Sequence, residues 1–109
     1  MRWFLTQKLS WNNENQFPHN SLWWEGLDGS KLFTHFPTAD TYCSEMTGEE
    51  LARAERNFKD KGRANMALLP YGYGDGGGGP TREMLETWRT VADLESSPRL
   101  VRQTPVEFF

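Results

Sequence analysis

The segment LLPYGYGDGGGGPT, residues 68–81, decides how the chain is interpreted, because an apolar run, a glycine-rich turn and a helix start follow one another in it. Met66 to Tyr71 is short, apolar and without alternation, which predicts a buried parallel strand. Pro80 marks the start of a helix. A loop between a strand and a helix lies where α/β folds place their active-site loops. The glycine-rich turn, with Asp75 near its centre, is therefore the candidate functional loop.

Helices and strands are expected to alternate from Thr47 onward. The sequence Thr47-Gly48-Glu49-Glu50 predicts a capping box, and the apolar stripe behind it predicts a helix that ends at Gly62. A second stripe, from Met84 to Ala92, predicts a helix after the glycine loop, and Arg99 to Gln103 predicts another strand. The order helix, strand, helix, strand favours an α/β fold with a parallel sheet and crossover helices.

The first part of the chain predicts a strand and a hairpin. Arg2 to Leu9 is a β-type run, and Ser10 to Ser21 is a polar loop broken by a proline. The apolar runs Leu22–Glu25 and Lys31–Phe36 flank an Asp-Gly pair, which indicates a β-hairpin. A capping box at Thr104 begins a helix where the sequence stops. We therefore expect an internal slice of a longer protein.

Two nucleotide-binding patterns match the glycine loop. Gly74, Gly76 and Gly79 satisfy G-x-G-x-x-G, and Gly74 with Gly79 satisfies the outer glycines of a P-loop. Pro80 stands where the P-loop needs lysine, and the Asp75 carboxylate would repel a phosphate. A nucleotide-binding α/β unit stays as an alternative that this chemistry disfavours.

Asp75 itself has two interpretations. Its flanking glycines let the backbone approach a ligand closely. The rings of Tyr71 and Tyr73 would form an apolar wall that favours a protonated carboxyl group, as a general acid requires. Alternatively, the loop is an exposed turn whose Asp caps the following helix. The residues alone do not decide between the two.

Composition excludes several classes of protein. Net charge is −3, with 12 basic and 15 acidic residues and no basic stripe, so nucleic acid is not an expected partner. Cys43 is alone, which excludes an internal disulfide and fits a reducing compartment. No apolar run has the length of a membrane span or the pattern of a signal peptide, so we expect a cytoplasmic protein without membrane contact. Aromatic residues make up 14%, which indicates rings that line a site or interface, or buried tryptophans.

Four segments together resemble the α-mannosidases of glycoside hydrolase family 38, in the cytosolic, vacuolar and bacterial subgroup. They are LTQKLSWN (residues 5–12), the paired Trp with GLDGS (23–30), THFPTADTY (34–42) and LLPYGYGDGGGGPT (68–81). The resemblance implies an N-terminal catalytic domain built on an irregular β/α barrel of seven parallel strands. Residues 1–109 would be a partial parallel β/α unit of that barrel, with a β-hairpin insertion, and no complete domain.

The resemblance also implies a retaining exo-mannosidase that removes terminal α-mannose with two carboxylates and one zinc ion. Asp75 matches the general acid/base; Lys8, Trp11, Asn12 and Tyr42 match substrate-binding positions. The nucleophile and the zinc ligands would lie outside this chain. His19, His35, Asp40 and Cys43 show no ordinary zinc spacing, so no metal ligand is expected here. His35 is interpreted as a packed, hydrogen-bonded strand histidine.

The expected partners are an α-mannoside or oligosaccharide and the rest of the parent chain, which this segment would need for folding. The isolated chain is expected to be inactive, with zinc bound by the complete enzyme only. A non-catalytic carbohydrate-binding module that uses the Trp-rich segment is a further alternative.

Overall fold

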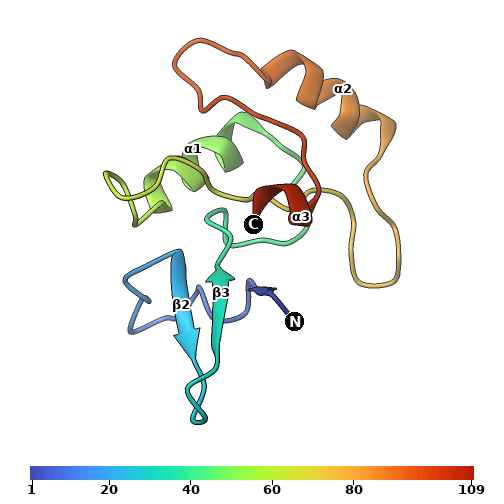
Figure 1. Cartoon of the computed structure of the whole chain (residues 1–109). Helices are drawn as coiled ribbons and strands as arrows, with labels where there is room; N and C mark the ends of the chain where they lie inside the picture. The colour runs from blue at the N-terminus through green and yellow to red at the C-terminus, as the bar shows by residue number, and fades with distance from the viewer.

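The computed structural model describes residues 1–109, with a small sheet at one end and helices at the other (Figure 1). The strands are β1 (Trp3–Leu5), β2 (Ser21–Glu25) and β3 (Lys31–His35); the helices are α1 (Gly48–Asn57), α2 (Arg82–Val91) and α3 (Pro105–Phe108). The sheet order is β1-β3-β2, so β3 is the central strand. No helix combines the length and apolar character that crossing a membrane requires.

The predicted hairpin is confirmed, and it forms most of the sheet. Strands β2 and β3 are antiparallel, with Ser21 opposite His35. The turn closes where the Gly26 amide donates to the Ser30 carbonyl at 2.8 Å. Gly29 adopts a φ of 81°, which a residue with a Cβ rarely adopts, so glycine suits this turn.

The parallel pairing lies elsewhere than predicted. It joins β1 to β3, with Trp3 opposite Phe33, and no helix connects these two strands. Strand β1 is also shorter than the predicted run from Arg2 to Leu9, because the chain turns after Leu5 and the Ser10 amide donates to the Gln7 carbonyl at 3.2 Å.

The strands predicted at residues 66–71 and 99–103 are wrong, since neither segment forms a ladder. Pro70 has no amide to donate, and the Leu68 amide donates to the side chain of His35 at 3.1 Å. Only one parallel bridge remains there, between Ser44 and Tyr71. The result is a mixed α/β fragment rather than the predicted parallel β/α unit, and the barrel remains an expectation from the resemblance.

Helix α1 begins as predicted, whereas α2 begins at Arg82, two residues after the predicted start at Pro80. Thr47 Oγ1 accepts from the Glu50 amide at 3.3 Å, and Glu50 Oε2 accepts from the Thr47 amide at 3.1 Å, which is the capping box. At α3 one half of the predicted capping box is present, because Glu107 Oε2 accepts from the Thr104 amide at 2.6 Å, while the Glu107 amide donates to the Thr104 carbonyl and not to its hydroxyl.

Helix α1 ends at Asn57, whereas the sequence predicted an end at Gly62. Phe58 is already extended, with a ψ of 109°. The amides of Arg63 and Ala64 then both donate to the Asp60 carbonyl at 2.9 Å, closing a separate turn in which Gly62 has a φ of 83°. Gly62 therefore belongs to that turn and not to the end of the helix.

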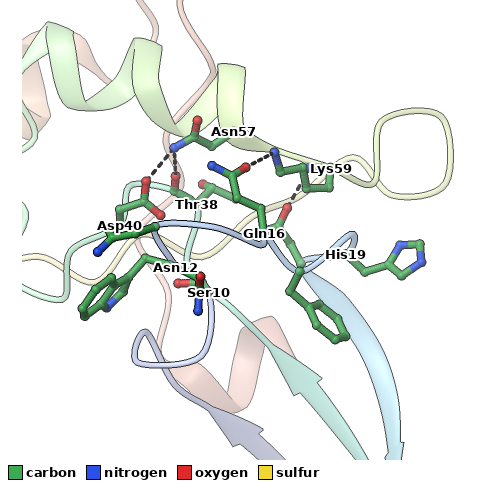
Figure 2. A pocket seen from close by; sticks show the side chains of 12 residues that line it. Ser10, Asn12, Gln16, His19, Thr38, Asp40, Asn57 and Lys59 are labelled. Carbon is green, nitrogen blue, oxygen red and sulfur yellow. Dashed lines mark hydrogen bonds between the residues drawn. The ribbon is translucent and has the colours of Figure 1, made fainter.

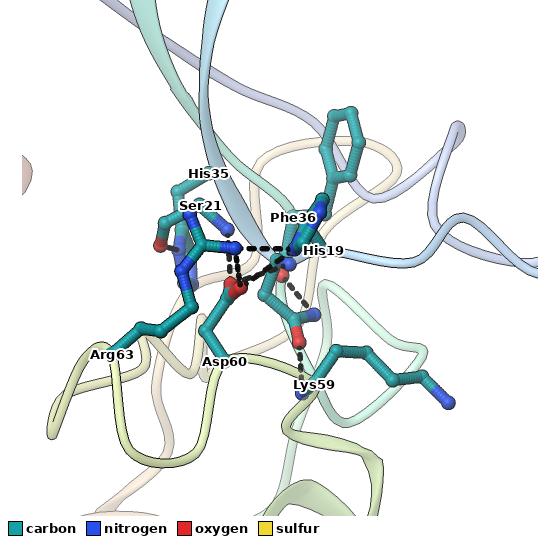
Figure 3. Close-up of polar contacts among 8 residues, drawn as sticks. His19, Ser21, His35, Phe36, Lys59, Asp60 and Arg63 are labelled. Atoms are coloured by element: carbon teal, nitrogen blue, oxygen red, sulfur yellow. Dashed lines mark hydrogen bonds and ion pairs between the residues drawn. The ribbon is translucent and has the colours of Figure 1, made fainter.

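A buried polar network, more than an apolar core, joins the sheet to the helical part. Only five hydrophobic side chains are fully buried: Phe36, Ala39, Met46, Leu51 and Met84. Asp60 is 2% exposed, and its carboxylate accepts from the amides of Asn20 and Ser21 at 2.8 Å each and contacts His19 Nδ1 at 2.9 Å (Figure 3). The turn after α1 is thereby fastened to the start of β2.

Asp60 is held as a carboxylate by these contacts. Burial alone would raise its pKa, but the hydrogen bonds from the Ser21 amide, from His19 and from the Asn20 amide outweigh burial and lower it. Asn20 extends the network, because its Oδ1 accepts from the Lys59 amide at 2.7 Å and its Nδ2 donates to the Phe36 carbonyl at 3.0 Å.

His35 is the packed, hydrogen-bonded histidine that was expected. It is fully buried. Its Nε2 accepts from the Leu68 amide at 3.1 Å, so the proton is on Nδ1, which donates to Ser21 Oγ at 2.9 Å. Burial lowers its pKa to about 4, against the opposing charge of Asp60.

Replacing Asp60 by Asn should destabilise the fold by about 3 kcal/mol, because buried amides lose a charged acceptor. Amide hydrogen exchange of the complete enzyme, compared at peptides that cover residues 18–24 and 58–65, measures the change as faster exchange in the variant. The control is Asp93→Asn, an exposed carboxylate whose replacement should alter stability by less than about 0.5 kcal/mol. Equal effects of the two substitutions would contradict the structural role of Asp60.

Stability should fall as pH decreases from about 6.5 to about 4, because the unfolded chain protonates His35 before the folded chain does. The full loss attributable to this residue is about 3 kcal/mol. Below about pH 4 both states bind the proton and this contribution stays constant.

Amide hydrogen exchange of β2 and of the segment around Leu68 in the complete enzyme, measured across this pH range and corrected for the intrinsic pH dependence of exchange, tests the assignment. The background is His19→Gln, which removes the other histidine of residues 1–109. In the further variant His35→Gln the amide still offers a donor and an acceptor but does not titrate. If the pH dependence of stability persists unchanged in His35→Gln, His35 is not the group responsible for it.

Candidate active site around Asp75

The glycine-rich loop is a closed turn that presents Asp75. The Tyr73 amide donates to the Gly79 carbonyl at 2.9 Å, and the Gly79 amide donates back to Tyr73. A Cβ on Gly72 would lie 2.6 Å from the Pro80 nitrogen, so only glycine fits there. Asp75 has a φ of 52°, a left-handed conformation that Asp tolerates better than most residues.

The loop packs against the segment that follows β3. The Ser44 amide donates to the Pro70 carbonyl at 3.2 Å, and the Gly72 amide donates to the Ser44 carbonyl at 3.0 Å. The Gly74 amide donates to Cys43 Sγ at 3.2 Å. A Cβ on Gly74 would lie 2.9 Å from the ring of Tyr42, so the close approach also requires glycine.

Three of the predicted site residues come together here. Tyr42 donates its hydroxyl to Asp75 Oδ2 at 2.6 Å. This hydrogen bond is the main reason that the pKa of Tyr42 is raised, since the neighbouring carboxylate disfavours the phenolate. The Lys8 ammonium lies 4.9 Å from the centre of the Tyr42 ring, within cation–π range. Lys8, Tyr42 and Asp75 therefore form one cluster.

The structure decides against one interpretation of Asp75. The cap of α2 is Thr81, whose Oγ1 accepts from the Met84 amide at 3.2 Å, so Asp75 does not cap that helix. The expected wall of Tyr71 and Tyr73 is replaced by other contacts, since Tyr71 lines a pocket with Met46 and Trp88 that does not include Asp75. The Tyr73 hydroxyl donates to Glu45 instead, at 3.3 Å, and Asp75 is exposed beside Tyr42.

Trp11 and Asn12 lie outside the Asp75 cluster. They line a cavity of about 190 Å³, which Lys8, Tyr42 and Asp75 do not line (Figure 2). Asn12 Oδ1 accepts from the amides of Glu14 at 2.8 Å and Asn15 at 3.0 Å, so it also shapes its own loop.

The same cavity includes two residues that the sequence did not single out as a pair, Asp40 and Asn57. Asn57 Nδ2 donates to Asp40 Oδ2 at 2.9 Å and to the Thr38 carbonyl at 3.0 Å. The two residues are 17 positions apart. No local motif joins residues at such a distance, so no sequence signal could have found this contact.

The chain's residues do not fit a zinc site. No group of three His, Cys, Asp or Glu side chains is arranged to hold a metal ion. Both ring nitrogens of His35 are engaged, and His19 contacts Asp60 through Nδ1.

A comparison of the sequence with known families identifies the class of protein to which the glycine loop and its carboxylate belong. The model of the glycosyl hydrolases family 38 N-terminal domain matches residues 1–109, and the chain belongs to that family.

Relatives in three organisms carry names from this family. The chain is 50% identical to Alpha-mannosidase G of Dictyostelium discoideum, over 97% of the chain and 10% of that protein. It is 46% identical to Alpha-mannosidase 2C1 of Homo sapiens, over 100% and 10% of the respective lengths. It is 45% identical to Alpha-mannosidase of Saccharomyces cerevisiae, over 85% and 9%. The chain thus spans about a tenth of the length of these relatives.

Replacing Asp75 by Asn should lower the pKa of Tyr42 toward its usual value near 10, because the phenol loses its hydrogen bond to a charged acceptor and the carboxylate no longer opposes the phenolate. The measurement is a pH titration of the tyrosine ¹³Cζ resonances in the complete enzyme and in its Asp75→Asn variant, with the Tyr42 signal assigned by its loss in Tyr42→Phe. Asp93→Asn is the matched control and should leave the titration unchanged. An unchanged pKa of Tyr42 in Asp75→Asn would contradict the hydrogen bond between Tyr42 and Asp75.

Proposed function

We propose that this chain is part of a longer retaining exo-α-mannosidase, in which Asp75 is the general acid/base. The observation that supports the assignment best is the presentation of Asp75. Its carboxylate is exposed at the tip of a closed glycine loop, and one of its oxygens is oriented by Tyr42. The names of the relatives indicate the α-mannoside substrate.

The chemistry follows from the hydrogen bond to Tyr42. Because Tyr42 donates to Oδ2 of Asp75, the proton of the acid form would be on Oδ1. From there it would pass to the glycosidic oxygen as the bond to the anomeric carbon breaks. In the second step the resulting carboxylate would take a proton from the water that releases mannose.

A retaining enzyme needs a second carboxyl group about 5–5.5 Å from the first, as nucleophile. We propose that it belongs to a part of the enzyme outside residues 1–109, together with the zinc ligands. Accordingly, we expect the isolated chain to be inactive and to depend on the remaining protein for folding. The expected compartment is the cytoplasm.

The remaining predicted residues have supporting roles in this proposal. Lys8 would offset the negative charge of the nucleophile, since its ammonium lies on the Tyr42 ring beside Asp75. Tyr42 would orient the acid and present a ring face to the sugar. Trp11 and Asn12 would contact a part of the substrate away from the scissile bond, because they line a different cavity.

In the complete enzyme, Asp75→Asn should reduce kcat/KM on unactivated mannosides by about 10²–10⁴-fold, because protonation of the leaving oxygen is lost. An aryl mannoside with an acidic leaving group needs less protonation and should lose much less in glycosylation. Steady-state rates on both substrates measure the difference, with Asp93→Asn as control. Normal turnover of unactivated mannosides by Asp75→Asn would rule out the acid/base role.

A further inference from the structure

The cavity beside Trp11 combines an aromatic ring with fixed polar groups. Trp11 is half exposed and lines the cavity together with the amide and carboxylate side chains of Asn12, Gln16, Asp40 and Asn57. Figure 2 shows Asp40, Asn57, Gln16 and Asn12 around the same hollow. A ring face beside planar hydrogen-bonding groups suits a ligand that has an apolar C–H face and hydroxyl edges.

The polar groups are held in place before any ligand arrives. Both donors of the Asn57 amide are engaged, with the Thr38 carbonyl and with Asp40 Oδ2, which leaves Asn57 Oδ1 and Asp40 Oδ1 as acceptors. Asp40 has a φ of 58°, and its carbonyl accepts from Gln7 Nε2 at 3.3 Å. Such prior ordering reduces the entropy lost on binding.

A second observation is independent of the exposed groups. Thr38 lines this cavity, and also a mainly apolar one with Leu51 and Phe58, and it is 1% exposed, yet its hydroxyl oxygen has no hydrogen-bond partner. Buried hydroxyl groups are nearly always paired, so an unpaired one calls for a partner. A ligand hydroxyl group in the cavity would supply that partner.

Charge and size narrow the ligand class. Asp40 and Lys59 bring one charge of each sign, and Lys59 Nζ donates to Gln16 Oε1 at 2.9 Å. The near balance gives no field that would select an anion such as a sugar phosphate. The volume of about 190 Å³ is below the usual range of about 300–1,000 Å³ for drug-sized ligands, which limits the ligand to a single ring.

We propose that this cavity is a sugar-binding site for one neutral hexopyranose ring, separate from the Asp75 cluster. Trp11 packs on the C–H face of the ring, while Asp40, Asn57 and Thr38 bond its hydroxyl groups. Mannose is chosen among the hexoses because of the proposed function. The sugar-binding site itself is argued from the geometry of the cavity and does not depend on that function.

The test uses the complete enzyme that contains this chain, carrying Asp75→Asn and labelled with 5-fluorotryptophan. Methyl α-mannopyranoside is added while fluorine resonances are recorded, and the signals of Trp11 and Trp23 are assigned by their loss in Trp11→Phe and Trp23→Phe. The Trp11 signal should shift with saturation and a Kd of about 1–10 mM. Trp23 is 66% exposed on β2, outside the cavity, and its signal should not move.

Two conservative variants test the polar contacts. Asp40→Asn retains a side chain that tolerates the left-handed backbone and should raise the Kd about tenfold, because a charged acceptor is lost. Thr38→Val keeps the shape of the buried side chain and should raise the Kd about three- to tenfold. An unchanged Trp23 signal verifies that each variant is folded.

Several outcomes would overturn the site: a Trp11 signal that stays still, equal shifts of Trp11 and Trp23, or a Kd indifferent to Asp40→Asn. A crystal of the complete enzyme soaked in the mannoside must also show the sugar beside Trp11. Residues from another part of the enzyme in that space would refute the proposal. Normal hydrolysis by Asp75→Asn, in contrast, would reject the acid/base assignment and leave the sugar site standing.

Discussion

The carboxylate of Asp60 is the constraint on which the arrangement of the chain depends. It is buried between the turn after α1 and the start of β2, and it satisfies the Asn20 and Ser21 amides there. Few apolar side chains are fully buried, and the aromatic contacts of Phe108 and Phe109 with the sheet hold only α3. Hydrophobic contact therefore does little to fix the sheet relative to the turn after α1. Directional hydrogen bonds to a buried charge specify it instead.

From this junction the chain leads to the candidate site. His35 ends β3 and bonds the Leu68 amide, so the segment before the glycine loop lies beside the sheet. The residues after β3 then carry Asp40 to the sugar cavity and Tyr42 to Asp75. Residues 35–42, a stretch of eight positions that begins at the end of β3, therefore contribute to both sites.

Local pattern predicted the local features well. The capping box at Thr47 and the Asp-Gly hairpin are confirmed, and half of the box at Thr104 is formed, because each depends on residues a few positions apart. The strand expected at residues 66–71 failed for the opposite reason. An apolar run forms a strand only when a neighbour supplies a ladder, and here a histidine side chain and a single bridge take up its hydrogen bonds.

By itself, the sequence determined the glycine loop with a carboxylate near its centre and, through resemblance, the family and the expected neighbours Lys8 and Tyr42. Only the tertiary structure decided that Tyr42 orients Asp75, that Thr81 caps α2 instead, and that Trp11 faces a second cavity. The physical reason is the distance along the sequence between the residues that interact. Tyr42 and Asp75 are 33 positions apart, and a hydrogen bond across that distance depends on how the whole chain packs rather than on any spacing of residue types.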